Sequence, residues 1–137
     1  MRRLLAMTVV TLLLAGCGSS GGTTTTQGAT GPQSVSVTME DYFFAPESVT
    51  VAAGATVNVT GDNPSGTDHT WTVLTAGDEV STAIGLPEER ILFQVYGTPG
   101  SSAVGSFVAP GPGIYQIICT ISGHVELGMT GTLIVSG

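Results

Sequence analysis

The sequence predicts an all-β fold, a β-sandwich or Greek-key barrel, for residues 34–137. Valine-rich segments of this region alternate apolar and polar residues with a period of two, as strands do. Glycine, proline and asparagine, which favour turns, separate these segments at short intervals. No stretch of the region keeps a helical period, and about a hundred residues are enough for one hydrophobic core. We therefore expect a single domain.

Alternating valines define the first expected strands. Gly54 and the run 61–66, Gly-Asp-Asn-Pro-Ser-Gly, supply the turns between them. Met39 and Trp71 are expected to belong to the core. The alternating residues are Val35, Val37, Met39, Val49, Val51, Val57 and Val59.

Two later strands are expected at residues 69–73 and 114–119. In the second of them, Ile114 and Ile118 lie on the face opposite to Cys119, which indicates burial on both faces. Residues 75–106 form the long connection between the two strands. We interpret this connection as an excursion with a strand of its own and one short helix within residues 78–90.

The N-terminus has the features of a bacterial lipoprotein leader. Two arginines precede the apolar run 4–14, which is shorter than the about 20 residues that a membrane-spanning helix needs. Leu14-Ala15-Gly16-Cys17 resembles the lipobox, so residues 1–16 are expected to be removed as a signal peptide and Cys17 to be acylated. An ordinary signal peptide with an incidental cysteine is the alternative.

Residues 17–33 are rich in glycine, threonine and serine and are expected to form a flexible tether behind the lipidated cysteine. Lipidation of Cys17 would leave Cys119 as the only thiol, which excludes an internal disulfide. Removal of the leader would leave Arg90 against ten Asp and Glu, a net charge of −9 with both histidines neutral. This charge excludes nucleic acid as a partner and makes acyl chains the means of membrane attachment.

The candidate metal site is the loop at residues 119–129. Cys119, His124 and Met129 place a thiolate, an imidazole and a thioether between two apolar, strand-like runs. Thiolate and thioether are soft ligands that select copper, and two histidines with one cysteine and a weak axial methionine form a blue copper site. The second histidine must come from elsewhere, and His69 is the only other one in the chain. We expect one copper ion per chain, cycling between Cu(I) and Cu(II).

The stretch from Tyr115 to Val135 resembles the copper-binding end of the cupredoxins, the small blue copper proteins. The spacing between His124 and Met129 is most similar to auracyanin and rusticyanin, and the chain is also similar to azurin. The resemblance continues upstream through residues 43–51 and 68–70, so it covers nearly all of residues 34–137 and implies a cupredoxin domain there. Ser122 departs from the family, which often has proline at this position.

The resemblance also implies contacts around the copper ligands. By position, the backbone amide of Thr70 is expected to bond to the Cys119 sulfur, and the Thr70 hydroxyl to contact Thr120. Such contacts hold the ligands in place and tune the metal. In the family, the histidine ligand that lies in the loop is the port through which the electron leaves. Here this residue is His124. Its neighbours in the loop, Ile121, Val125 and Leu127, are expected to form an apolar patch for docking.

Counting residues excludes other copper classes. A binuclear centre needs two cysteines on the ligand loop, and multicopper enzymes need His-x-His pairs; the sequence has neither. No pair of carboxylates is placed for acid and base chemistry, and Met129 argues against a nucleophilic cysteine. We expect a protein that is not an enzyme.

The resemblance implies a monomer that carries single electrons between redox proteins, such as a cytochrome or a respiratory or photosynthetic complex. The expected location is the extracytoplasmic face of a bacterial membrane, periplasmic or at the cell surface, with a lipid anchor. The alternative is a copper-binding or copper-delivery lipoprotein without a role in electron transfer. Delivery favours exposed methionines and histidines that exchange the metal readily, whereas a closed Cys-His-His-Met site retains it.

Overall fold

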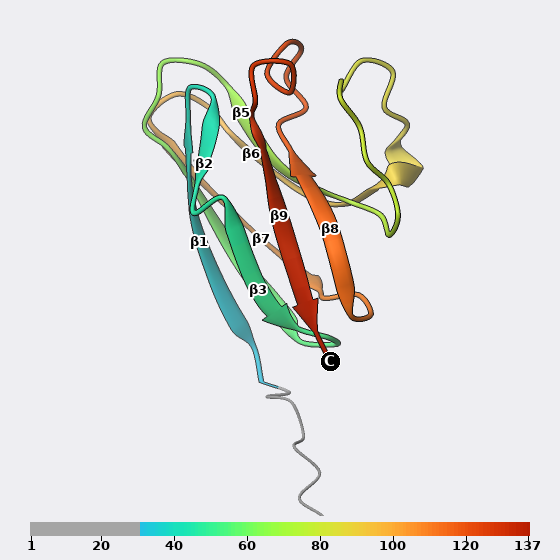
Figure 1. The fold of residues 1–137 in the computed structure, drawn as a ribbon. Helices are drawn as coiled ribbons and strands as arrows, with labels where there is room; N and C mark the ends of the chain where they lie inside the picture. Colours follow the sequence, from blue (N-terminus) through green and yellow to red (C-terminus); the bar gives the residue numbers. More distant parts are fainter. Residues whose placement is uncertain (1–30) are drawn as a thin grey trace, which may run out of the picture.

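The protein is a sandwich of two β-sheets in a computed structural model that describes residues 31–137 (Figure 1). The first sheet has the order β2-β1-β4-β7, with β1 (Gln33–Glu40), β2 (Phe43–Ala45), β4 (Thr56–Asn63) and β7 (Ser101–Val108). The second has the order β3-β9-β8-β5-β6, with β3 (Ser48–Ala52), β9 (Thr130–Ser136), β8 (Gly113–Ile118), β5 (His69–Leu74) and β6 (Ile91–Gly97). The predicted all-β sandwich is confirmed. The predicted leader, the acylated Cys17 and the tether up to residue 30 lie outside the described residues.

The core lies between the sheets because most strands turn alternate apolar residues towards the facing sheet. Two pairings are parallel, β1 with β4 and β3 with β9, and the other pairings are antiparallel. All the alternating valines of the predicted strands are buried, as are Met39 and Trp71, which are fully enclosed. The Trp71 indole packs edge-on against Phe93, and its N–H has no hydrogen-bond partner in the described part of the chain.

The long connection differs from its prediction. Residues 91–108 form two strands, β6 and β7, one in each sheet, instead of one strand in an excursion. The excursion is limited to residues 75–90, which we call the covering segment. The expected short helix is a single 3-10 turn, η1 (Glu88–Arg90), because Pro87 precedes it in an extended conformation and β6 begins at Ile91.

The covering segment packs on the outer face of the second sheet. Its apolar residues Val80, Ala83 and Leu86 contact a small cluster formed by Leu74, Ile118 and Val125. Burial of Ile118 on this face is therefore as predicted. Ile114 stays 75% exposed at the other end of β8, so the prediction that both isoleucines are covered was wrong for Ile114.

Polar contacts fix the covering segment to the sheet. The Gln116 side chain accepts from the Val80 amide (2.7 Å) and donates to the Val80 carbonyl (2.9 Å). Arg90 pairs with Asp78 at 2.8 Å, and the Thr75 hydroxyl donates to the same carboxylate. These contacts close the segment on itself and against β8.

One end of the sandwich gathers the loops that carry the predicted ligands. The β1–β2 turn, the β4–β5 loop and the loop between β8 and β9 all lie there, opposite to the C-terminus and to the start of β1 (Figure 1). The described residues contain no helix with the length and apolar character needed to cross a bilayer.

Candidate metal centre

Three of the predicted ligands meet at the loop end of the sandwich. His69 begins β5, Cys119 follows β8, and His124 lies in the loop 119–129, which we call the ligand loop. The donor atoms of these residues all lie within 4.8 Å of one another. Cys119 and His69 are fully buried and His124 is 8% exposed, so the cluster is closed to bulk water.

The spacing of the donors fits a bound metal ion. Cys119 Sγ lies 3.4 Å from Nδ1 of His124 and 3.9 Å from Nδ1 of His69. With bonds of about 2.3 Å to sulfur and about 2.0 Å to nitrogen, as for zinc, a trigonal arrangement separates its donors by roughly 3.5–3.8 Å. The two measured distances fall on either side of this range. One thiolate and two imidazoles, without a carboxylate among them, favour copper over hard cations.

The ligand loop brings Met129 to the same centre. The Cys119 amide donates to the Met129 carbonyl (3.2 Å), and the Met129 amide donates to the His124 carbonyl (3.0 Å). Gly123 and Gly128 have φ angles of +85° and +96°, a conformation in which a side chain is strained, and they make the two bends of the loop. Met129 is fully buried in the core cluster that also contains Cys119.

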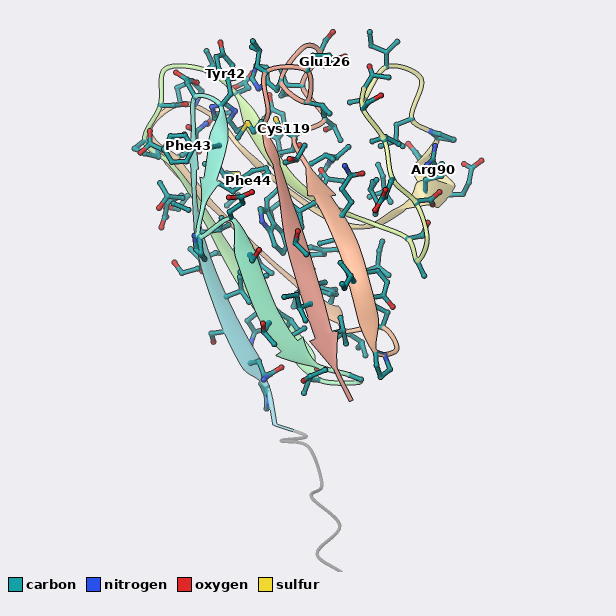
Figure 2. All side chains as sticks on the ribbon, viewed as in Figure 1. Tyr42, Phe43, Phe44, Arg90, Cys119 and Glu126 are labelled. Atoms are coloured by element: carbon teal, nitrogen blue, oxygen red, sulfur yellow. The ribbon has the colours of Figure 1, made fainter. Side chains whose placement is uncertain are left out.

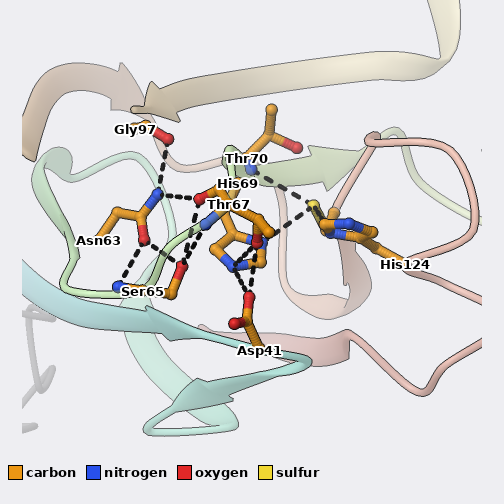
Figure 3. A network of polar contacts seen from close by, with 9 residues as sticks. Asp41, Asn63, Ser65, Thr67, His69, Thr70, Gly97 and His124 are labelled. Carbon is orange, nitrogen blue, oxygen red and sulfur yellow. Dashed lines mark hydrogen bonds and ion pairs between the residues drawn. The ribbon is translucent and has the colours of Figure 1, made fainter. Parts of the chain in front are cut away.

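Thr70 links β5 to the cysteine and to the ligand loop. Its amide donates to Cys119 Sγ at 3.4 Å (Figure 3). Its hydroxyl accepts from the Thr120 amide at 2.7 Å. The two threonine hydroxyls are 3.0 Å apart. Thr72 and Gln94, which sequence reasoning missed, extend the network. Thr72 donates to the Thr70 hydroxyl, and Gln94, its partner across β5 and β6, donates to the hydroxyls of Thr72 and Thr120.

Asp41 touches the ligand His69 and was also missed. Its Oδ1 lies 2.9 Å from Nε2 of His69, the ring nitrogen turned away from Cys119 (Figure 3). Its 28-residue separation from His69 carries no spacing signal, since the contact depends on how β1 and β5 cross. The Thr67 hydroxyl, which donates to Asp41 at 2.6 Å, holds the pKa of Asp41 below its usual range, and His69 adds to this effect.

The residue after Asp41 covers the other imidazole. The Tyr42 ring packs edge-on against His124, with ring centroids 4.8 Å apart, and lies 6.5 Å from the ring of His69. Burial lowers the pKa of His124, and the neighbouring His69 lowers it further. A lowered pKa favours the neutral imidazole, which is the form that binds a metal.

The β4–β5 loop is held by a buried amide. Asn63 is 1% exposed, and its Nδ2 donates to the carbonyls of Thr67 and Gly97, each at 2.8 Å. Its Oδ1 accepts from the amide and the hydroxyl of Ser65. The sequence indicated a turn here. The structure shows that the turn also sets Thr67 beside Asp41 (Figure 3).

One of the three residues expected in the apolar patch around His124 is not exposed. Val125 is only 6% exposed, because the covering segment packs on it, so its assignment to the patch was wrong. Ile121 is partly buried against the core, and Leu127 is 60% exposed. Phe43, next to Tyr42, is 53% exposed at the same end of the molecule (Figure 2).

Comparisons with known proteins agree with this site. A family model described as the sulfocyanin (SoxE) domain matches residues 44–137. Auracyanin-A of Chloroflexus aurantiacus is 31% identical over an alignment of 154 positions, which covers 97% of this chain and 94% of the relative. Auracyanin-B of the same organism is 29% identical over 68% of this chain, and the match spans 47% of that relative's own length. The solved structure of dithionite-reduced auracyanin from Roseiflexus castenholzii has a TM-score of 0.67 at 26% identity, covering 80% of this chain and 99% of the other.

Proposed function

Because this chain belongs to the sulfocyanin (SoxE) domain family of auracyanin- and rusticyanin-like cupredoxins, we propose that it carries single electrons between redox proteins. It has the cupredoxin fold and one type 1 copper site, formed by His69, Cys119, His124 and Met129. Auracyanin and rusticyanin homologues are electron carriers without enzymatic activity, which agrees with the prediction that this chain is not an enzyme. The observation that carries the proposal is the buried cluster of His69, Cys119 and His124.

The chain's own residues keep the site unchanged while an electron passes. A copper ion bound here supplies a one-electron couple between Cu(I) and Cu(II). The amide of Thr70 holds the Cys119 sulfur, and Asp41 holds the outer nitrogen of His69. Tyr42 packs on the His124 ring, so these three ligands are held in place when the charge changes. Little rearrangement means a small barrier to transfer.

The second candidate is copper delivery. Exchange of the metal requires ligands that a partner protein can reach. Here the three clustered donor residues are 8% exposed or less. Met129 is fully buried, and hydrogen bonds to Cys119 and His124 hold its backbone. This burial favours retention of the metal and therefore the carrier.

Voltammetry and a chelator distinguish the two functions. We expect a reversible one-electron wave, an intense blue colour in the oxidised protein, and slow loss of copper to a chelator in both oxidation states. Cys119→Ser should abolish the colour, because the thiolate is the source of the visible absorption, and His69→Ala should weaken it. A Cys119→Ser protein that stays intensely blue would overturn the ligand assignment, and fast copper loss would favour delivery.

We also propose that the protein is a lipoprotein tethered through Cys17 to the extracytoplasmic face of a bacterial membrane. The position of β1 supports this arrangement. The strand starts at the end of the sandwich opposite to the ligand loop, so a tether before it leaves the copper end free for partners (Figure 1). The partners proposed are a cytochrome or a respiratory or photosynthetic complex, which a monomer would meet at this surface.

Fractionation of cells tests the tether. The native protein should partition with membranes, and its intact mass should include the acyl chains. Cys17→Ser should release the protein or leave the precursor uncut. A native protein without lipid would contradict the tether while leaving the electron-carrier function unaffected.

A further inference from the structure

Asp41 is the one carboxylate in the described part of the chain that is hydrogen-bonded to a copper ligand. We propose that Asp41 is a positioning residue of the copper centre, which acts through His69 to favour Cu(II) and lower the reduction potential. This inference rests on the proposed one-electron function. It adds a residue that touches neither the metal-facing nitrogen of His69 nor the cysteine.

The geometry fixes the direction of the bond. Nδ1 of His69 faces Cys119 Sγ, so it is the nitrogen that binds the metal. The ring proton must then sit on Nε2, which lies 2.9 Å from Asp41 Oδ1 and donates to it. A carboxylate in this position fixes the tautomer and the orientation of the ring, and it makes the imidazole a stronger electron donor.

The charge on Asp41 has nothing else to neutralise it within the described residues. Arg90, the only Lys or Arg of residues 31–137, pairs with Asp78 in the covering segment. The Thr67 hydroxyl donates a hydrogen bond to Asp41 Oδ1 and holds the carboxylate beside the ring. The carboxylate therefore places a negative charge behind a fully buried ring. Such a charge stabilises the doubly charged copper ion more than the singly charged one.

The surroundings keep Asp41 in place. Thr67 is held by Asn63, whose buried amide bridges the carbonyls of Thr67 and Gly97. The next residue, Tyr42, is fixed by its contact with the ring of His124. The β1–β2 turn thus contacts both ligand imidazoles, with a charge on one and an aromatic ring on the other. Because the Asp41 side chain is 41% exposed, water screens part of its charge.

Three variants separate the charge from the hydrogen bond. Asp41→Asn keeps an oxygen that accepts from Nε2 and removes the charge, whereas Asp41→Ala removes both. Asp68→Asn is the matched control, since it removes the carboxylate that precedes His69 in sequence and has no hydrogen bond to the ring. Midpoint potentials are measured by spectroelectrochemistry. The His69 Nε2 proton is followed by NMR in the diamagnetic Zn(II)-loaded protein, so one readout is independent of electron transfer.

We expect Asp41→Asn to shift the Cu(I)/Cu(II) equilibrium towards Cu(I) by about tenfold, which is about 59 mV for a one-electron couple. The blue colour should persist and the Nε2 proton should stay visible. Asp41→Ala should lose that proton to fast exchange, and Asp68→Asn should shift the equilibrium by less than about threefold, or about 28 mV.

Equal potentials for the wild type and Asp41→Asn would overturn the proposal, as would equal shifts in Asp41→Asn and Asp68→Asn. Free exchange of the His69 Nε2 proton in the Zn(II)-loaded wild type would also overturn it. Failure of the carrier function itself would appear differently, as the absence of a reversible wave in the wild type.

Discussion

Single residues hold three of the four copper ligands in place. Thr70 donates its amide to the sulfur of Cys119, and Asp41 accepts from the outer nitrogen of His69. Tyr42 packs edge-on against His124. None of these contacts joins neighbours in sequence, since Thr70 follows His69 but contacts Cys119, 49 positions away. A ligand set that is visible in sequence is thus positioned by residues that are mostly not.

The axial ligand is tested by Met129→Leu. A thioether donates weakly to copper and favours Cu(II), so its replacement by an apolar side chain should raise the reduction potential. The blue colour should remain, because Cys119, His69 and His124 stay in place. Leucine is close to methionine in volume, so the fully buried position should lose less than about 1.5 kcal/mol of stability. An unchanged potential in direct voltammetry would remove Met129 from the coordination sphere.

Among the elements, the covering segment gives the ligand loop its outer support. Residues 75–90 carry no ligand, yet their apolar side chains bury Val125, the neighbour of His124. Gln116 bridges both backbone groups of Val80, and the Arg90–Asp78 pair closes the base of the segment. A rigid ligand loop therefore depends on a segment that looks like an ordinary long connection in sequence.

Leu86→Ala tests this support. The leucine is partly buried against the cluster of Leu74, Ile118 and Val125, so its truncation should cost about 1–2 kcal/mol of unfolding free energy. Ile84→Ala is the control, since Ile84 lies two residues away and is 73% exposed. It should stay within about 0.5 kcal/mol of the wild type. Denaturant unfolding of the copper-free protein measures both, and equal effects would show that the segment gives no specific support.

The molecule as a whole combines an acidic surface with an apolar copper end. Residues 31–137 contain ten Asp and Glu against one Arg. Leu127, in the ligand loop, and Phe43, next to Tyr42, are exposed. Opposite charge on a partner raises the rate of encounter, and an apolar contact sets the geometry of docking.

Electron transfer to a cationic cytochrome should therefore slow as salt rises past 0.1 M, where the Debye length is about 10 Å. Leu127→Asp should slow the transfer further, because it places a charge in the docking surface, with the copper spectrum unchanged. Val108→Asp is the control. Val108 is 65% exposed and pairs with Thr56 at the opposite end of the sandwich, so its charge should leave the rate nearly unchanged. Stopped-flow mixing measures the transfer rates of the wild type and the two variants. Transfer by Leu127→Asp at the wild-type rate would place the electron's exit on another face.

The sequence by itself determined the fold class and the ligand types. Alternation of valines is a local signal, since successive side chains of a strand point to opposite faces, and the predicted valines are all buried. Cys119, His124 and Met129 lie within eleven residues, so their spacing is visible without a fold, and His69 follows because the chain has no other histidine. The lipobox at Cys17 is equally local, and its acylation stays a prediction.

Only the tertiary structure decided which residues surround the ligands. Asp41 precedes His69 by 28 residues, and Gln94 precedes Thr120 by 26, so neither pair has a spacing that a local pattern could reveal. Burial was also misjudged where it depends on another element. Val125 is covered and Ile114 is exposed because the covering segment reaches one end of β8 and not the other. Contacts between distant segments arise from how the sheets pack, and this packing is what places a charge behind His69.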